Sequence, residues 1–187
     1  MADLVKNGYF LNGGKGQLAV ADNWTWNNQG NGGIFNYTTL NGAYGNNRTV
    51  SAYPAGSGIN YFQLFTDYGA TVPVTIQQTI TFPKAGNYVL SFWGAGSTTW
   101  NPSYPVNVSI GSIASSSVFY DVNSPWRQDF IPFSVNSSQL SQGLTVSTCG
   151  FNSGIFSVAV SNVVISSTDY TLDLFFEWIP DDEDKNK

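Results

Sequence analysis

Apolar residues in this chain of 187 residues recur at every second position, and this alternation constrains the fold more than any other feature. In the clearest run, residues 74–82, Val74, Ile76, Ile80 and Phe82 are separated by Thr and Gln side chains. A period of two is typical of β-strands with one buried face, whereas an amphipathic helix needs a period of 3.6. The sequence therefore predicts a chain built from strands, with little helix.

The strands predicted in this way are short and separated by turn-forming segments. Residues 74–82 and 88–93 flank the turn sequence of residues 83–87, which predicts an antiparallel hairpin. The same alternation predicts strands at residues 5–10, 33–37, 48–52, 61–65, 106–110, 116–122, 127–135, 144–149 and 155–165. About ten short strands with this spacing are typical of an all-β, two-sheet antiparallel sandwich of the jelly-roll type. We expect Trp24, Trp93 and Trp126 in its core.

The composition excludes several classes of protein. With 42% hydrophobic and only 10% charged residues, the chain is expected to fold rather than to remain disordered. Cys149 is the only cysteine and there is no histidine, so a disulfide scaffold and a Cys/His zinc site are excluded. No apolar run approaches the ~20 residues of a membrane span. The first residues do not resemble a secretory signal, so we expect such a signal to be either absent or already removed.

The charge is divided unevenly along the chain. Residues 1–168 contain five acidic and five basic residues, whereas residues 169–187 contain seven acidic and two basic ones. The net charge of −5 therefore belongs to the C-terminal segment. We expect a jelly-roll domain over residues 1–168 and an apolar and acidic arm over residues 169–187. Since no basic stripe is present, nucleic acid is not an expected partner.

The arm is the part of the chain most suited to docking. It carries six large apolar residues ahead of an acidic run: Leu172, Leu174, Phe175, Phe176, Trp178 and Ile179. Exposed to water, such a segment would promote aggregation. It is therefore expected to be covered, either as an added strand on its own body or by a groove on another chain.

Several motifs follow one another in an order that resembles a known family. They are Asn-Gly-Tyr-Phe at residues 7–10, Asn-Trp-Thr-Trp at 23–26, the run at 79–93, Pro-Trp-Arg-Gln-Asp-Phe at 125–130 and Ser-Asn-Val-Val-Ile at 161–165. Together they resemble the galactose-binding-like jelly roll of carbohydrate-binding modules of the family 4/9 kind, over residues 4–166. The resemblance implies a structural calcium held by carboxylates. Here the equivalent positions are Leu11, Ser161 and Asn162, so we expect no bound metal and no cofactor.

Groups that transfer protons are scarce. There is no histidine and no glutamate before Glu177, which excludes Ser/His/Asp and Cys/His catalytic systems in the body. Glycoside hydrolysis needs two facing carboxylates, and nothing in the sequence brings two together. Asp129 follows Arg127 in a predicted strand and is expected to face solvent. The protein is therefore expected not to be an enzyme.

Aromatic residues near loops are abundant, and they suit a sugar-binding site. Sugar rings present apolar C–H faces and hydroxyl groups, so a glycan site needs flat aromatic side chains beside polar ones. Candidate ligand-binding residues are Trp26, Tyr37, Tyr44, Arg48, Tyr53, Trp100 and Tyr104, with Asn46, Asn47 and Gln63 as further polar partners. For any single one of these aromatic residues, a place in the core or in a subunit contact is favoured over a ligand-binding role.

Two functions remain open from the sequence. The first is a structural protein of a capsid or other particle, because a stand-alone jelly roll resembles structural proteins of large DNA viruses and phages. Its partners would be other protein subunits, and it would be located in the virion or particle. The alternative is a carbohydrate-binding module or adhesin that recognises a polysaccharide, located outside the cell or at its surface.

Overall fold

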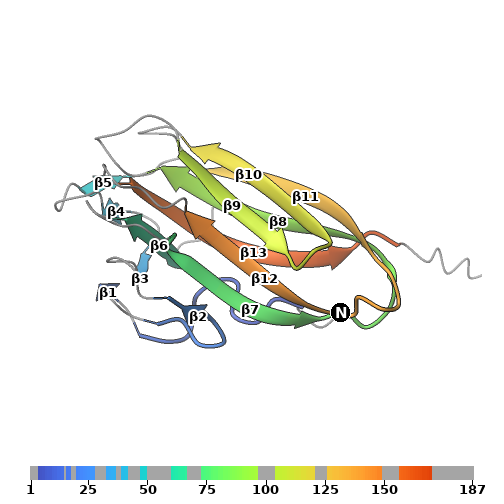
Figure 1. Ribbon diagram of the computed structural model, residues 1–187. Coiled ribbons are helices and arrows are strands. Elements are labelled where there is room, and N and C mark those ends of the chain that lie inside the picture. Colours follow the sequence, from blue (N-terminus) through green and yellow to red (C-terminus); the bar gives the residue numbers. More distant parts are fainter. Residues whose placement is uncertain are drawn as a thin grey trace, which may run out of the picture.

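The computed structural model describes residues 4–14, 16–17, 20–27, 33–36, 39–41, 47–49, 60–66, 73–96, 104–120, 126–148 and 156–169. These residues form strands and turns and no helix, and all strand pairs are antiparallel. Figure 1 shows two layered sheets. The predicted two-sheet antiparallel β-sandwich is therefore confirmed.

The six-stranded sheet has the order β1 (Gly16–Gln17), β3 (Gly33–Asn36), β6 (Asn60–Thr66), β13 (Phe156–Ser167), β8 (Gly86–Gly96) and β11 (Arg127–Val135). The five-stranded sheet has the order β10 (Ala114–Tyr120), β9 (Tyr104–Ile110), β12 (Ser141–Thr148), β7 (Thr75–Thr81) and β2 (Thr25–Trp26). The strands β4 (Thr39–Asn41) and β5 (Asn47–Thr49) form a separate pair. The short strands β1, β2 and β4 carry too few residues to show an alternation and were not predicted.

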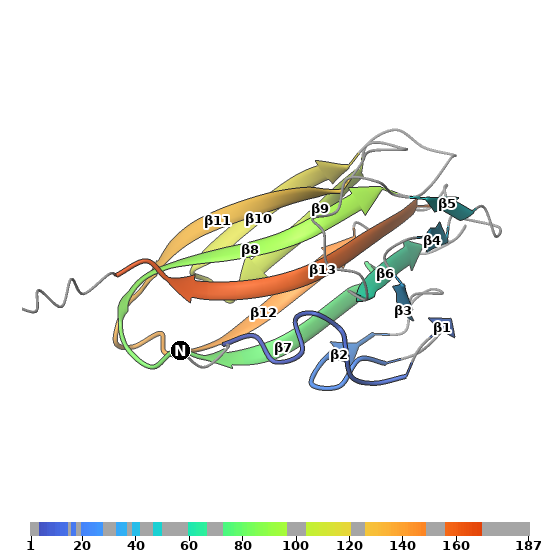
Figure 2. The same ribbon diagram turned by 180° about the vertical axis from the view of Figure 1, so that it is seen from behind.

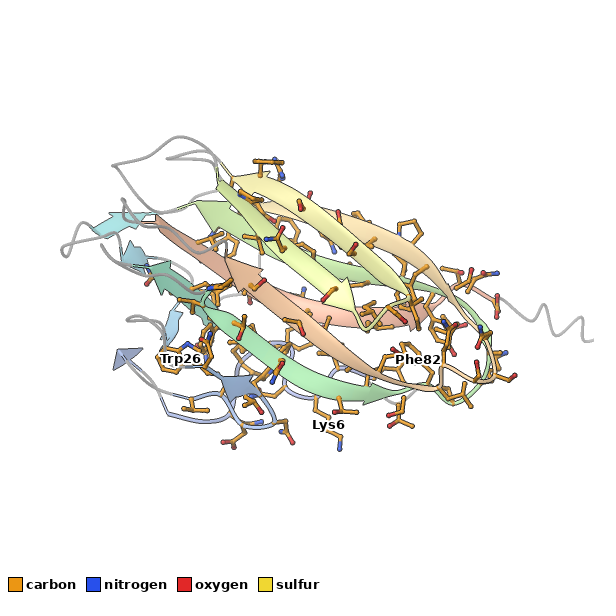
Figure 3. The ribbon with its side chains drawn as sticks, viewed as in Figure 1. Lys6, Trp26 and Phe82 are labelled. Carbon is orange, nitrogen blue, oxygen red and sulfur yellow. The ribbon has the colours of Figure 1, made fainter. Side chains whose placement is uncertain are left out.

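The core lies between the two sheets and is filled from alternate positions of the strands. Ile76 and Ile80 of β7 and Leu90 of β8 are fully buried, as the period of two predicts. At one end of the sandwich, Phe82 (labelled in Figure 3) has its ring centroid 4.9 Å from that of Tyr88 and 5.8 Å from that of Phe133. These aromatic contacts fill the end of the core where the chain passes between the sheets.

The predicted hairpin of residues 74–82 and 88–93 is wrong. The strands β7 and β8 belong to different sheets: β7 pairs with β12 and β2, and β8 pairs with β11 and β13. Both strands point their apolar side chains into one core from opposite sides, across the ~10 Å between packed sheets. Alternation identifies the buried face of a strand, but it does not identify the sheet to which that strand belongs.

The strand predicted at residues 5–10 is also wrong, because this segment forms turns. The backbone N–H of Phe10 donates to the carbonyl of Asn7, and the buried Asn60 side chain donates to the carbonyl of Phe10. The Gln78 amide accepts from the Lys6 N–H at 3.0 Å and donates to the Lys6 carbonyl at 3.1 Å. The segment thereby closes one long side of the sandwich, with the Lys6 side chain pointing outward (Figure 3).

The three tryptophans expected in the core are not equivalent. Trp24 and Trp126 are buried, whereas Trp93 is half-buried. Its neighbour in β8, Phe92, is 1% exposed and takes the inner position. Trp93 therefore lies on the outer face of the six-stranded sheet, opposite Ser161 of β13, and its assignment to the core was wrong.

Candidate functional site

The outer face of the five-stranded sheet is covered by small neutral polar side chains. The inner residues of its strands are buried, so the intervening residues face outward. These outward residues are Thr25 of β2, Thr75, Gln77, Thr79 and Thr81 of β7, Ser141, Gly143, Thr145 and Ser147 of β12, Pro105, Asn107 and Ser109 of β9, and Ser115, Ser117 and Phe119 of β10. No charged residue is among them in the described strands. We call this surface the hydroxyl face.

The pairing register aligns the hydroxyl face into two rows that cross the sheet. One row runs through Thr75, Ser147, Asn107 and Ser117, and the other through Thr25, Gln77, Thr145, Ser109 and Ser115. Neighbouring side chains in a row are separated by the strand spacing, ~4.8 Å. Hydroxyl groups act as both donors and acceptors, so the rows offer hydrogen bonds of either kind to a neutral ligand.

An exposed aromatic residue stands at one end of the hydroxyl face. Phe119 of β10 is 53% exposed and lies opposite Pro105 of β9. Asn107 and Ser117, two residues further along these strands, join their side chains by a hydrogen bond of 2.7 Å. A flat apolar ring therefore borders polar groups on a single surface, the combination that sugar rings need.

The edge beside Phe119 carries a linked set of polar groups. Arg127 donates from Nη2 to the Phe119 carbonyl at 2.7 Å, and its Nε lies 3.2 Å from Oδ2 of Asp129. The Tyr120 hydroxyl donates to the same Asp129 oxygen at 2.7 Å, and the guanidinium carbon lies 4.7 Å from the centroid of the Tyr120 ring. Asp129 is thus half-buried and bonded, whereas it was expected to face solvent.

Tyr120 remains protonated in this set. Burial, and then the hydrogen bond to Asp129, raise the pKa of the Tyr120 phenol far above its ordinary value. The phenol can donate a hydrogen bond at neutral pH, but it cannot act as a base or an anionic nucleophile. The set therefore holds a fixed carboxylate and a guanidinium at the edge of the sheet.

The structure places Trp26 away from the hydroxyl face. It is half-buried and pairs with Ile76 of the neighbouring strand β7. Its ring packs edge-to-face on that of Phe62, with 5.7 Å between the ring centroids. Its indole Nε1 is buried and makes no hydrogen bond within the described part of the chain. Gln63, expected as a polar partner, is 3% exposed in β6.

Most other predicted site residues lie outside the described residues. This applies to the aromatic residues Tyr37, Tyr44, Tyr53 and Trp100, and to the arm residues Leu172, Leu174, Phe175, Phe176, Trp178 and Ile179. Arg48 and Tyr104 lie in β5 and β9, but their side chains are not described. Tyr104 pairs with Tyr120 and Pro105 pairs with Phe119, so the start of β9 lies beside Phe119.

Phe119, Arg127 and Asp129 were not selected from the sequence as ligand-binding residues. Phe119 lies between Val118 and Tyr120, and three consecutive apolar residues hide the alternation that marks the outer face. Ser115 and Ser117 mark the alternate positions of β10 that face solvent, and this alternation could have assigned Phe119 to the same outer face.

No group of three or more His, Cys, Asp or Glu side chains comes together in the described part of the chain. Of the positions where the resemblance implied calcium ligands, Leu11 is exposed and Ser161 is buried. The Ser161 hydroxyl donates to the Asn60 carbonyl. The described residues also contain no helix long and apolar enough to cross a membrane.

No family model matches this chain, and no curated protein matches it. Solved structures are similar in fold. A family 61 carbohydrate-binding module in complex with β-1,4-galactotriose has a TM-score of 0.55 and 16% identity, over 89% of this chain and 99% of that one. A cyclase from Fischerella sp. has a TM-score of 0.60 and 13% identity, over 89% and 97%.

The enzymatically active domain of tailspike protein 4 from bacteriophage CBA120 has a TM-score of 0.54 and 14% identity, over 88% of this chain but 21% of that one. These likenesses identify the fold as a jelly roll like that of carbohydrate-binding modules. The same fold serves binding modules and enzymes, so function has to be argued from the site.

Proposed function

We propose that this protein is a non-catalytic carbohydrate-recognition module that binds a neutral glycan on its hydroxyl face. The observation that carries the proposal is an uncharged sheet face, lined by hydroxyl and amide groups and ending at the exposed Phe119. A ring of the glycan would stack on Phe119, and the following rings would lie along the rows of polar side chains.

The chemistry of the face matches a neutral sugar better than other ligands. Nucleic acids and acidic lipids need cations, which the described strands do not place on this face. Hydroxyl and amide side chains hydrogen-bond to sugar hydroxyls, and neighbouring side chains within a row lie ~4.8 Å apart, which is close to the length of one sugar ring. The similar fold of the module that binds β-1,4-galactotriose makes galactans the first ligands to test.

The described carboxylates support a binding role without catalysis. Asp22 lies in the turn before β2, Asp129 in β11 and Asp169 after β13. Hydrolysis by two carboxylates requires them to face one glycosidic bond. Asp129 accepts hydrogen bonds from Tyr120 and Arg127. Asp169 accepts a hydrogen bond from Asn87, which lies at the start of β8, at the opposite end of the β8–β11 pair from Asp129.

Binding to immobilised neutral polysaccharides tests the proposal. Phe119→Ala should weaken binding by roughly fivefold to a hundredfold, because stacking on an aromatic ring is worth ~1–3 kcal/mol by analogy with base stacking, and tenfold corresponds to 1.4 kcal/mol. Tyr9→Ala removes another exposed aromatic residue, from the N-terminal turn, and is the matched control. Equal binding by wild type and Phe119→Ala would contradict the proposed site, and no binding to any neutral polysaccharide would contradict the function.

A second function, a component of a virus or phage particle, is favoured by the similarity to the tailspike domain. In that protein the matching region is a minor part of a longer chain. Under this proposal the module would be displayed on a particle or outside the cell, with neighbouring subunits as partners. Co-sedimentation with assembled particles would support it, and recovery of the protein only as a free monomer would contradict it.

A further inference from the structure

We propose that residues 171–179 add to the free edge of β11 in the same chain as an antiparallel strand, closing the open side of the sandwich. The N-terminal segment closes the opposite side, through Gln78 and Asn60. The inference does not depend on the proposed glycan site, and it selects one of the two docking modes that the sequence leaves open.

The edge of β11 is available for pairing. In the described sheet its one neighbour is β8, and Phe130 is 61% exposed. Pro132 lies within an unbroken ladder opposite Val89, and proline fits there only if its nitrogen faces away from β8. The alternation of an antiparallel ladder then directs the backbone groups of Gln128, Phe130 and Ser134 toward the free edge as well.

Apolar side chains are also incompletely covered on this side of the sandwich. Ile131 of β11, with Ile113 and Ala114 at the start of β10, are half-buried residues packed against the core. Figure 1 shows β10 and β11 together along one edge of the molecule. An additional strand beside β11 would cover this side with its inward row of side chains.

The last described residues direct the chain toward β11. The Thr168 N–H donates to the Asn87 carbonyl at 2.9 Å, and Asn87 donates from its backbone and side-chain nitrogens to the Asp169 carboxylate at 3.3 Å. The Ser134 hydroxyl donates to Oδ1 of Asn87 at 2.7 Å. These bonds link the end of β13, across the start of β8, to the end of β11, and Figure 2 shows the three together.

The sequence of the arm has the form of a strand of matching length. Leu172, Leu174, Phe176 and Trp178 occupy alternate positions, and the residues between them are Asp173, Phe175 and Glu177. Residues 171–179 are as many as the 9 residues of β11. A strand that starts beside Ser134 and runs antiparallel to β11 ends beside Arg127.

The charges agree with this direction. The acidic run of residues 181–184 would follow the proposed strand and reach the end of β11 that begins with Arg127. The Arg127 side chain is 49% exposed. The same chain is the favoured occupant because Asp169 is already held at the end of β8, and a short tether gives an effective concentration of order millimolar.

Amide hydrogen exchange in the full chain tests the proposal residue by residue. The amides of Gln128, Phe130 and Ser134 should exchange at least tenfold more slowly in wild type than in Phe176→Asp. The amides of Asp129 and Ile131 face β8, so they should be protected in both proteins and show that the fold is intact. Equal exchange of the outward amides in the two proteins would overturn the proposal.

Cysteine cross-linking identifies the occupant. Gln128→Cys is combined in turn with a cysteine at position 175, 177 or 179, with Cys149→Ser in every variant. At least one pair should form a disulfide within the monomer, because directly paired strands bring Cα atoms within bridging distance. Thr79→Cys on the hydroxyl face, combined with the same arm positions, is the control and should form none. Disulfide-linked dimers would assign the edge to a second copy, and the absence of any cross-link would exclude pairing; either result overturns the proposal.

Discussion

Replacing Tyr120 by Phe tests the linked set of polar groups at the edge of the hydroxyl face. Tyr120 is 1% exposed, and its hydroxyl donates to Asp129 at 2.7 Å. A hydrogen bond to a charged group is worth ~1.5–3 kcal/mol. Since Asp129 keeps Arg127 as a partner and is partly accessible to water, we expect a loss near the lower end, about 1.5 kcal/mol at pH 7.

The same substitution should change the response to alkaline pH. In the unfolded chain Tyr120 loses its proton near its ordinary pKa of 10, whereas in the fold burial raises that pKa well above it. Above pH 10 the folded wild type therefore binds more protons than the unfolded chain, and its stability falls as pH rises. The decrease in unfolding free energy caused by this phenol approaches ~1.4 kcal/mol per pH unit. Tyr120→Phe has no phenol at this position, so its unfolding free energy should not show this decrease.

Urea denaturation of both proteins at pH 7 and between pH 9 and 11 measures the two effects. The free-energy difference between wild type and Tyr120→Phe should be constant up to pH 9 and decrease above pH 10. Tyr9→Phe, which alters an exposed phenol, is the matched control and should follow wild type. Curves for Tyr120→Phe that stay parallel to those of wild type up to pH 11 would refute the role assigned to burial of this phenol.

Three further substitutions test the packing that positions the site. Gly94→Ala should destabilise the fold by ~1–3 kcal/mol in thermal unfolding, because the added methyl group would overlap the Tyr120 ring and hydroxyl; wild-type stability would contradict this contact. Leu90→Ala, in the fully buried core, should cost ~2–5 kcal/mol in urea unfolding, and a cost below 1 kcal/mol would mean that the position is not in the core. Gln78→Leu removes both hydrogen bonds to the Lys6 backbone and should cost ~1–2 kcal/mol while speeding proteolysis of the N-terminal segment; an unchanged cleavage rate would show that Gln78 does not anchor it.

The sequence was sufficient for the fold class and for most long strands. Alternation over residues 74–82 identified the buried face of β7, and the same pattern located β8, β11 and β13. It could not assign strands to sheets, because strands in the two layers of a sandwich bury their side chains in the same core. For this reason β7 and β8 were predicted as a hairpin although they lie in opposite sheets.

The candidate site was harder to predict because it depends on strands that are distant in the sequence. The hydroxyl face needs β7, β9, β10 and β12 in a register set by pairing, and each strand alone shows only serines and threonines of an ordinary surface. Arg127 could be recognised as a charge within a strand, but its bonds to Phe119 and Asp129 depend on the approach of β10 to β11. Trp26 was chosen for its aromatic ring, and its inner position follows from pairing with Ile76.

Mapping of amide chemical shifts during titration with a soluble neutral galacto-oligosaccharide tests the proposed function most directly. We expect saturable shifts at Phe119, Asn107 and Ser117 and along the rows of the hydroxyl face, with Val89 and Val164 on the outer face of the six-stranded sheet unaffected. Saturable shifts confined to the six-stranded sheet would contradict recognition by the hydroxyl face. No shifts with any neutral oligosaccharide tested would contradict glycan recognition altogether.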